Sequence, residues 1–170
     1  MNPAQLKDLY ARKASALARR PRLARGAHQL RVRLWRDLTC VVEHPRHALV
    51  ADAPPGDGGR GEGPDPGELM VASLGASLAI GYRLWGARLD VAIEAVDVEI
   101  LCEYDTRGEL GAADVPVGWQ RLVLAALITS RASEAEVRGV FDAANRHCPM
   151  LANLSTSIDR TLRLIVTPPR

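Results

Sequence analysis

The stretch between Glu68 and Arg83 carries no formally charged residue, and its apolar side chains would cover every face of a helix. A helix that is apolar all round belongs inside a protein core. The stretch is also too short, and too rich in glycine and serine, for a convincing membrane span. Just before it, Asp65 is placed to act as an N-cap and Pro66 suits the first helical position. The sequence therefore predicts a buried central helix over residues 66–86.

The composition indicates a soluble globular protein, because 47% of the 170 residues are apolar and 25% are charged. The charge is uneven: residues 1–36 hold ten Lys/Arg and one Asp, a net of +9, whereas the remainder nets −7. Such a basic arm is able to contact nucleic acid or an anionic membrane. We interpret it instead as a solvated helix and strand that pack on the acidic body, and expect neither nucleic acid nor membrane as a partner.

Three cysteines, odd in number and far apart, do not make a disulfide framework. No apolar stretch of the secretory type follows Met1. We therefore expect a reducing, cytoplasmic environment.

Periodicity divides the rest of the chain into helices and strands. The predicted elements are, in order, a basic helix over 3–19, short strands near residues 29–35, 39–42 and 48–50, the central helix, strands over 96–104 and 119–129, a helix opened by a capping box at 133–136, and a strand over 157–166. This order predicts an α+β fold in which antiparallel sheet packs on helices.

We expect the chain to form a single domain over residues 1–170. Within it we distinguish a basic helical arm (1–25), an N-terminal meander with a Gly/Pro loop (27–65), and a central helix with a C-terminal α/β lobe (66–170). The Gly/Pro loop, residues 53–65, resembles phosphate-binding loops in its glycine content. It lacks their terminal Lys-Ser/Thr pair and the glycine spacing of a dinucleotide fingerprint. A conformationally special loop that leads into the central helix is the better interpretation.

Several ordered motifs together carry a family resemblance. They are Asp52–Pro55, Gly58–Pro66, Glu68–Leu69, Leu74–Ser77 and, late in the chain, the Cys-Pro segment of His147–Met150. From about residue 31 to 166 the sequence resembles the OsmC/Ohr family of organic-hydroperoxide-resistance proteins. The resemblance implies an OsmC-like fold: antiparallel sheets wrapped around central buried helices in an intertwined homodimer, with active sites at the interface.

The resemblance also implies a thiol peroxidase that needs no cofactor. In the family, one cysteine on the central helix attacks an organic hydroperoxide, and a second cysteine in the Cys-Pro segment resolves the sulfenic acid as a disulfide. A lipoyl or other dithiol reductant reopens that disulfide. An arginine keeps the attacking thiol ionised, and a glutamate holds the arginine.

This chain departs from that pattern at the attacking cysteine, whose position is taken by Ser77. A serine hydroxyl is not ionised at neutral pH and its oxygen is not reversibly oxidised, so we expect two-cysteine peroxidase activity to be impaired or lost. Cys148 matches the resolving cysteine, although it also suits a small apolar position at a helix end. Cys40 and Cys102 lie in strand patterns and are interpreted as core residues.

Two charged residues complete the implied site. Glu68 matches the family glutamate, and Arg36 lies where the family arginine is usually found. Nine residues of helix turn through about 900°, which sets Glu68 and Ser77 on opposite faces. Glu68 therefore serves the site only from a frayed first turn or across the dimer; otherwise it is a carboxylate at a helix N-terminus, stabilised by the dipole.

Three functional hypotheses follow. The first is a family member without the two-cysteine cycle that keeps an apolar interface pocket, where Ser77 hydrogen-bonds a small molecule. The second is a one-cysteine peroxide reductase that uses Cys148, tuned by Arg36 and Glu68. The third is a non-catalytic interaction protein that uses the basic arm.

Hydrolase and metal chemistry are poorly supported. Residues 75–79 approximate the Gly-x-Ser-x-Gly elbow of hydrolases, but that motif needs a strand-to-helix turn at the serine, and Ser77 falls inside the predicted helix. No cluster of His, Cys and carboxylates has metal-ligand spacing, since His44 and His47 in a proline turn are a weak pair. We expect no metal site.

Overall fold

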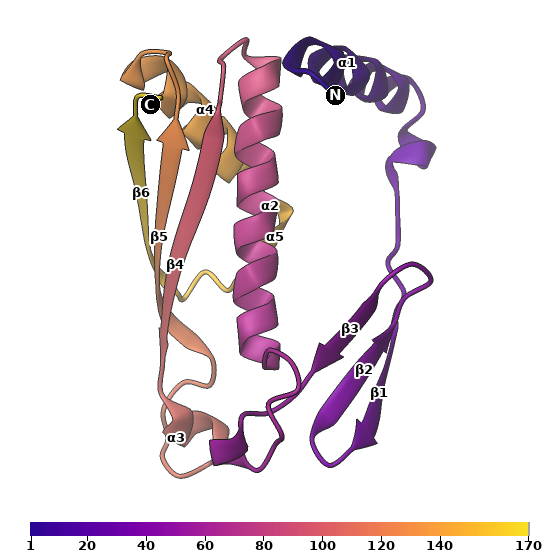
Figure 1. Cartoon of the computed structure of the whole chain (residues 1–170), viewed down its shortest axis with the longest axis vertical. Helices are drawn as coiled ribbons and strands as arrows, with labels where there is room; N and C mark the ends of the chain where they lie inside the picture. The colour runs from indigo at the N-terminus through magenta and orange to yellow at the C-terminus, as the bar shows by residue number, and fades with distance from the viewer. Residues whose placement is uncertain (170) are drawn as a thin grey trace. The chain divides into compact units, whose positions relative to one another are not determined.

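The computed structural model describes residues 1–169, which form two compact units (Figure 1). The N-terminal unit is Ser15–Ala72, and the C-terminal unit combines Met1–Ala14 with the chain from Ser73 onward. Helices α1 (Pro3–Arg19) and α2 (Pro66–Arg88) each contribute residues to both units. Both helices were predicted from the sequence and are confirmed.

The N-terminal unit is built on a three-stranded antiparallel meander. After the short 3₁₀ helix η1 (Pro21–Ala24), its strands are β1 (Arg31–Arg36), β2 (Thr39–Glu43) and β3 (Ala48–Ala51). Asp37 turns β1 into β2 with a φ of 45°, a left-handed conformation that aspartate tolerates. The turn places Arg36 and Thr39 as partners in the register. A further 3₁₀ helix, η2 (Pro55–Asp57), lies in the Gly/Pro loop.

The C-terminal unit contains a second three-stranded sheet in the order β4-β5-β6. Strands β4 (Ala95–Tyr104) and β5 (Trp119–Thr129) pair antiparallel, as predicted. Strand β6 (Asp159–Thr167) runs parallel to β5, so the expectation of antiparallel sheet is wrong for this pair. The reason is the connection, because a parallel neighbour needs a long crossover, here supplied by α4 (Glu134–Arg146) and α5 (Pro149–Ala152).

Helices α2 and α4 cover one face of this sheet and enclose the apolar core (Figure 1). Alternate residues of β5 are fully buried, which is the period-two pattern of a strand with one covered face. The capping box predicted at Ser133 and Glu136 opens α4. The segment between β4 and β5, predicted as loop, also holds the one-turn helix α3 (Thr106–Glu109). The buried core side chains include Leu74, Leu78 and Tyr82 of α2, Leu122, Leu124 and Ile128 of β5, and Val137, Val140 and Phe141 of α4.

Helix α2 does not bury every face within the chain, which corrects the prediction of an enclosed central helix. Leu74, Leu78 and Tyr82 are buried, but Ile80 on the same helix is 59% exposed. The described residues therefore cover only part of the surface of α2. Among residues 1–169, α2 is also the one helix long and apolar enough to cross a membrane by length and composition alone, a test that the core helix of a soluble protein passes too.

Candidate functional site

Ser77 and Cys148 lie side by side in the C-terminal unit. Ser77 is half-buried on α2, and Cys148 is the N-cap residue of α5, with 5% of its surface exposed. The Ser77 Oγ and Cys148 Sγ atoms are 3.5 Å apart, a distance at which either atom can donate a hydrogen bond to the other. A serine and a cysteine 71 positions apart in the sequence thus share one site.

The local sequence fixes Cys148 between two helices. Helix α4 ends at Arg146, and the His147 amide still donates to the Ala143 carbonyl at 3.2 Å. The His147 ring packs on Trp85 of α2 with 4.6 Å between ring centroids. Pro149 then starts α5 at the first helical position, which proline favours. Cys148 is therefore held at the junction rather than on a free loop.

Arg160 of β6 anchors the segment that follows Cys148. Its guanidinium donates to the main-chain carbonyl oxygens of Leu151, Leu154 and Ser155, at 3.3, 2.9 and 2.6 Å respectively. The Leu151 carbonyl lies at the end of α5, and the Leu154 and Ser155 carbonyls lie in the turn after it. One side chain of the sheet thereby anchors the main chain from Leu151 to Ser155, directly after the Cys-Pro segment.

A buried tyrosine lies next to this segment. The Tyr82 hydroxyl donates to Asn145 Oδ1 at 2.9 Å, and the Tyr82 ring stacks on Phe141. Burial raises the pKa of Tyr82, and the Asn145 hydrogen bond only partly opposes that shift. Tyr82 therefore stays a neutral phenol at physiological pH, and it is no candidate for a general base.

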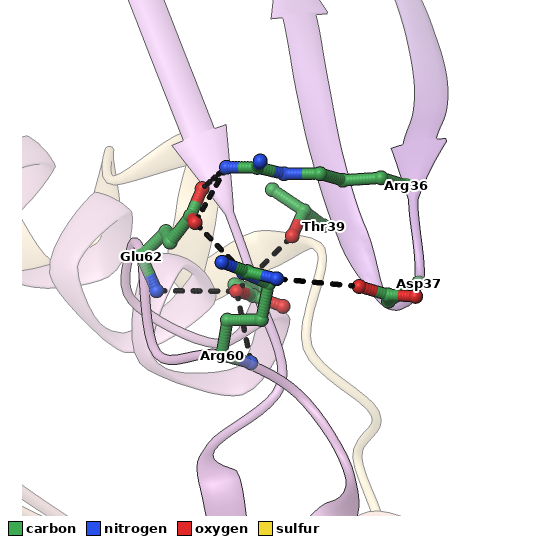
Figure 2. A network of polar contacts seen from close by, with 6 residues as sticks. Arg36, Asp37, Thr39, Arg60 and Glu62 are labelled. Carbon is green, nitrogen blue, oxygen red and sulfur yellow. Dashed lines mark hydrogen bonds and ion pairs between the residues drawn. The ribbon is translucent and has the colours of Figure 1, made fainter.

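Arg36 and Glu62 form an ion pair in the N-terminal unit. The Arg36 Nη2 atom lies 2.5 Å from Glu62 Oε1 and 2.7 Å from Glu62 Oε2, while Arg60 Nε reaches Glu62 Oε1 at 3.0 Å (Figure 2). The Arg36 hydrogen bond lowers the pKa of Glu62, and the same contact raises the pKa of Arg36. The Arg36 guanidinium also lies 4.4 Å from the Trp35 ring. Arg36 is thus a charged group fixed by a carboxylate.

Glu68, the glutamate expected beside Arg36, has a different partner in this structure. Its carboxylate accepts a hydrogen bond from the Asp65 amide at 2.9 Å, and the Glu68 amide donates to Asp65 Oδ1 at 2.8 Å. This reciprocal pair is a capping box at the start of α2, and it confirms Asp65 as the N-cap. The carboxylate that meets Arg36 belongs to Glu62, which sequence reasoning missed. The available signal was a charged pair, Arg60 and Glu62, isolated among glycines.

Comparison with known protein families matches residues 58–163 to the family described as OsmC-like protein. The match spans more than half of the chain. The chain belongs to the OsmC-like family. Among curated proteins, none matches the sequence.

Solved structures agree with the OsmC-like fold. An OsmC-like protein from Mycoplasma pneumoniae has a TM-score of 0.71 at 18% identity, covering 85% of this chain and 99% of its own. An organic hydroperoxide resistance protein OsmC from Legionella pneumophila has a TM-score of 0.64 at 18% identity, with 84% and 100% covered. A protein from Vibrio cholerae described as a putative organic hydroperoxide resistance protein, with captopril bound in one active site, has a TM-score of 0.58 at 17% identity, with 82% and 93% covered.

Of the four residues singled out in the sequence, this OsmC-like protein brings Ser77 and Cys148 together. Within the N-terminal unit, Arg36 and Glu68 bind separate partners. The three cysteines are all free. Cys102 packs against the core and burial raises the pKa of its thiol, which suits a structural residue better than a nucleophile. Among residues 1–169, no group of three or more His, Cys, Asp or Glu side chains is placed to hold a metal.

A groove of about 490 Å³ runs along α2 in the C-terminal unit. Apolar residues from α1, α2 and β4 form most of its wall, including Leu6, Ile80 and Val96. Ser77 and Cys148 are not among its lining residues. The apolar pocket expected at a dimer interface therefore stays a prediction.

Proposed function

We propose that this OsmC-like protein derives from thiol-dependent organic hydroperoxide reductases and lacks their two-cysteine cycle, because Ser77 occupies the place of the attacking cysteine. It keeps the resolving position as Cys148 and binds an apolar small molecule or an organic hydroperoxide at the site. The observation that carries the proposal is the 3.5 Å approach of Ser77 Oγ to Cys148 Sγ. In the family reaction the residues at these two positions form a disulfide, and here the two positions are neighbours.

The missing step follows from the chemistry. In the two-cysteine cycle the attacking thiolate bonds to one peroxide oxygen, the O–O bond breaks, and the alcohol leaves as the sulfur becomes sulfenic acid. The second thiol then displaces water to give a disulfide, and a dithiol returns both sulfurs to thiols. Ser77 has no sulfur to oxidise, so the first step has no nucleophile at this position.

The test is an assay with cumene hydroperoxide and a lipoyl dithiol, comparing the wild type with Ser77→Cys, Cys148→Ser and the double variant. We expect an inert wild type and peroxide consumption by Ser77→Cys that disappears when Cys148 is also replaced. The new side chain must rotate to bring the two sulfurs to the ~2.05 Å of a disulfide. A wild type that turns over and loses activity with Cys148→Ser would overturn the proposal in favour of one-cysteine chemistry.

The burial of Cys148 weighs against the one-cysteine hypothesis, because a thiol that reacts alone must meet both peroxide and reductant. The hypothesis of an interaction protein rests on the basic arm, where Arg20, Arg22 and Arg25 have no carboxylate partner among the described residues of the N-terminal unit. Salt-sensitive binding to nucleic acid that depends on residues 1–25 would support that hypothesis. A cytoplasmic location stays part of the proposal.

A homodimer is the proposed assembly. Both faces of β1 are exposed, and Val32, Leu34 and Trp35 are among its exposed side chains. A three-stranded sheet that leaves both faces of a strand to water is poorly stabilised, so a second copy supports this unit by covering the strand. Val32→Asp should lower the dimer fraction in analytical ultracentrifugation, while Arg46→Asp in the exposed β2–β3 turn should not.

Small-molecule binding can be tested separately from catalysis. Captopril, which the Vibrio cholerae protein holds in an active site, is a suitable probe. We expect captopril to raise the melting temperature of the wild type, and Ser77→Val to reduce that shift. An unchanged melting temperature at millimolar captopril would argue against a retained pocket of this kind.

A further inference from the structure

A buried carboxylate organises the N-terminal unit. Asp52 follows β3 directly and is only 2% exposed. Its Oδ2 atom accepts hydrogen bonds from Thr39 Oγ1 at 3.2 Å, the Arg60 amide at 3.2 Å and the Glu62 amide at 3.1 Å. Thr39 is itself fully buried at the start of β2. One oxygen therefore ties the meander to two amides of the Gly/Pro loop.

The loop closes tightly around this carboxylate. The Gly61 amide donates to the Ala53 carbonyl at 3.2 Å. A Cβ atom at Gly59 would lie 1.9 Å from the Ala53 carbonyl oxygen, and a Cβ atom at Gly63 would lie 2.4 Å from the Val50 carbonyl oxygen. Only glycine fits at these two positions. The amides that a phosphate-binding loop would offer to a ligand are occupied here by the protein's own Asp52.

Asp52 is ionised at neutral pH in this setting. Burial raises its pKa, but hydrogen bonds from the Glu62 amide, the Arg60 amide and the Thr39 hydroxyl more than offset that effect, and the pKa falls below the usual value. A negative charge is therefore available to hold the two amides throughout the physiological range.

We propose that Asp52 is a positioning residue: it fixes the main chain at Arg60 and Glu62 so that the Glu62 carboxylate meets Arg36. The Arg60 and Glu62 amides, two residues apart, donate to the same oxygen of Asp52. The side chains of Arg60 and Glu62 meet each other, and the Glu62 carboxylate binds Arg36 (Figure 2). The inference rests on the proposed function and on the family resemblance, which implies that an arginine, matched here by Arg36, keeps the attacking thiol ionised. It assigns to Glu62 the role that the family resemblance gave to Glu68.

A direct measurement of the ion pair tests the positioning. We would compare wild type, Asp52→Asn, Asp52→Ala and the control Asp57→Asn, which removes an exposed carboxylate of the same loop, by NMR of the Arg36 guanidinium and of the Glu62 carboxyl. We expect the pKa of Glu62 to rise toward its usual value in both Asp52 variants and to stay unchanged in Asp57→Asn. Formate should restore the Asp52→Ala signals, since it fills the vacated carboxylate site.

A merely structural role predicts a different result. In that case the Asp52 variants would have a lower melting temperature while the Glu62 pKa and the Arg36 signals remained those of the wild type, and the proposal would be wrong. If either Asp52 variant fails to fold, Thr39→Val removes one of the three donors with little change in volume. A partial rise of the Glu62 pKa in Thr39→Val supports the proposal, and no rise overturns it.

Activity adds an independent readout in the Ser77→Cys protein. There we expect Asp52→Asn to lower kcat/KM by about tenfold or more, with Asp57→Asn within about twofold of its parent. If Ser77→Cys itself consumes no peroxide, the proposed function fails, and the NMR comparison still decides whether Asp52 positions the Arg36–Glu62 pair. The two failures are thereby distinguishable.

Discussion

The two units of this protein are stabilised in different ways. The C-terminal unit encloses a large apolar core between one face of a sheet and two helices, as most domains do. The N-terminal unit buries little apolar surface, and its most enclosed side chains are Thr39 and Asp52. The C-terminal unit therefore depends on apolar packing, and the N-terminal unit depends on hydrogen bonds to the Asp52 carboxylate. Substitutions should therefore affect the two units by different mechanisms.

The largest effect is expected in the apolar core. Leu78 is completely buried on α2, so Leu78→Ala should lower the free energy of unfolding by about 2–5 kcal/mol through lost burial and the cavity that remains. Leu110→Ala is the matched control, because Leu110 is 75% exposed in the same unit. Urea denaturation measures both, and equal midpoints for the two variants would contradict a core centred on α2.

The next largest effect is expected in the Gly/Pro loop of the N-terminal unit, where one glycine packs against the main chain and another lies in open space. Gly59→Ala places a methyl group against the Ala53 carbonyl and should lower the free energy of unfolding by about 1–3 kcal/mol. Gly56→Ala, three residues earlier, meets no atom within 4 Å and should be nearly neutral. The comparison fails if both glycines tolerate alanine equally in denaturant titrations.

A smaller effect concerns pH. The Arg36 hydrogen bond lowers the pKa of Glu62 in the folded protein, so ionised Glu62 favours folding above about pH 4.3, the usual glutamate pKa. That contribution disappears as the pH falls through the lowered value. Arg36→Met should return the Glu62 pKa toward its usual value and flatten this part of the stability curve. Carboxyl NMR titration measures the shift, and an unmoved Glu62 would mean that Arg60 alone causes it.

The smallest effect is expected for exposed ion pairs. Arg121 and Glu103 are 3.0 Å apart across β5 and β4, with about half of each side chain in water. Arg121→Gln should change the free energy of unfolding by less than about 1 kcal/mol, because solvent screens such pairs. The double variant with Glu103→Gln completes a cycle, and a coupling energy above that limit would contradict this expectation.

Local patterns explain what the sequence predicted well. Apolar and charged residues alternate along most of strand β4, and the capping box at Ser133 and Glu136 involves only residues close in the sequence. The parallel pairing of β6 was missed because no local pattern records the direction of a partner strand. The incomplete burial of α2 was missed for a related reason, since the hydropathy of a helix does not show how much of its surface the rest of the chain covers.

In the candidate site, too, local motifs were predictable and contacts between distant residues were not. Ser77 and Cys148 were found from two sequence motifs, and the fold brings them together. Glu62 was not predicted as the partner of Arg36, because the two residues are 26 positions apart and only the folded chain brings them together. Glu68 caps α2, one of the roles considered for it from the sequence, and its part in the site stays a prediction. The central place of Asp52 depends on donors from β2 and from a loop about ten residues away, a convergence that exists only in the folded chain.

The Arg160 contacts have a consequence for how this protein can evolve. Arg160 binds main-chain carbonyls, which every amino acid provides, and not the side chains of the segment after Cys148. Mutations at exposed positions such as Asn153 or Ser155 therefore leave the anchor intact. Selection is therefore able to change the surface side chains that follow Cys148 while the thiol keeps its place.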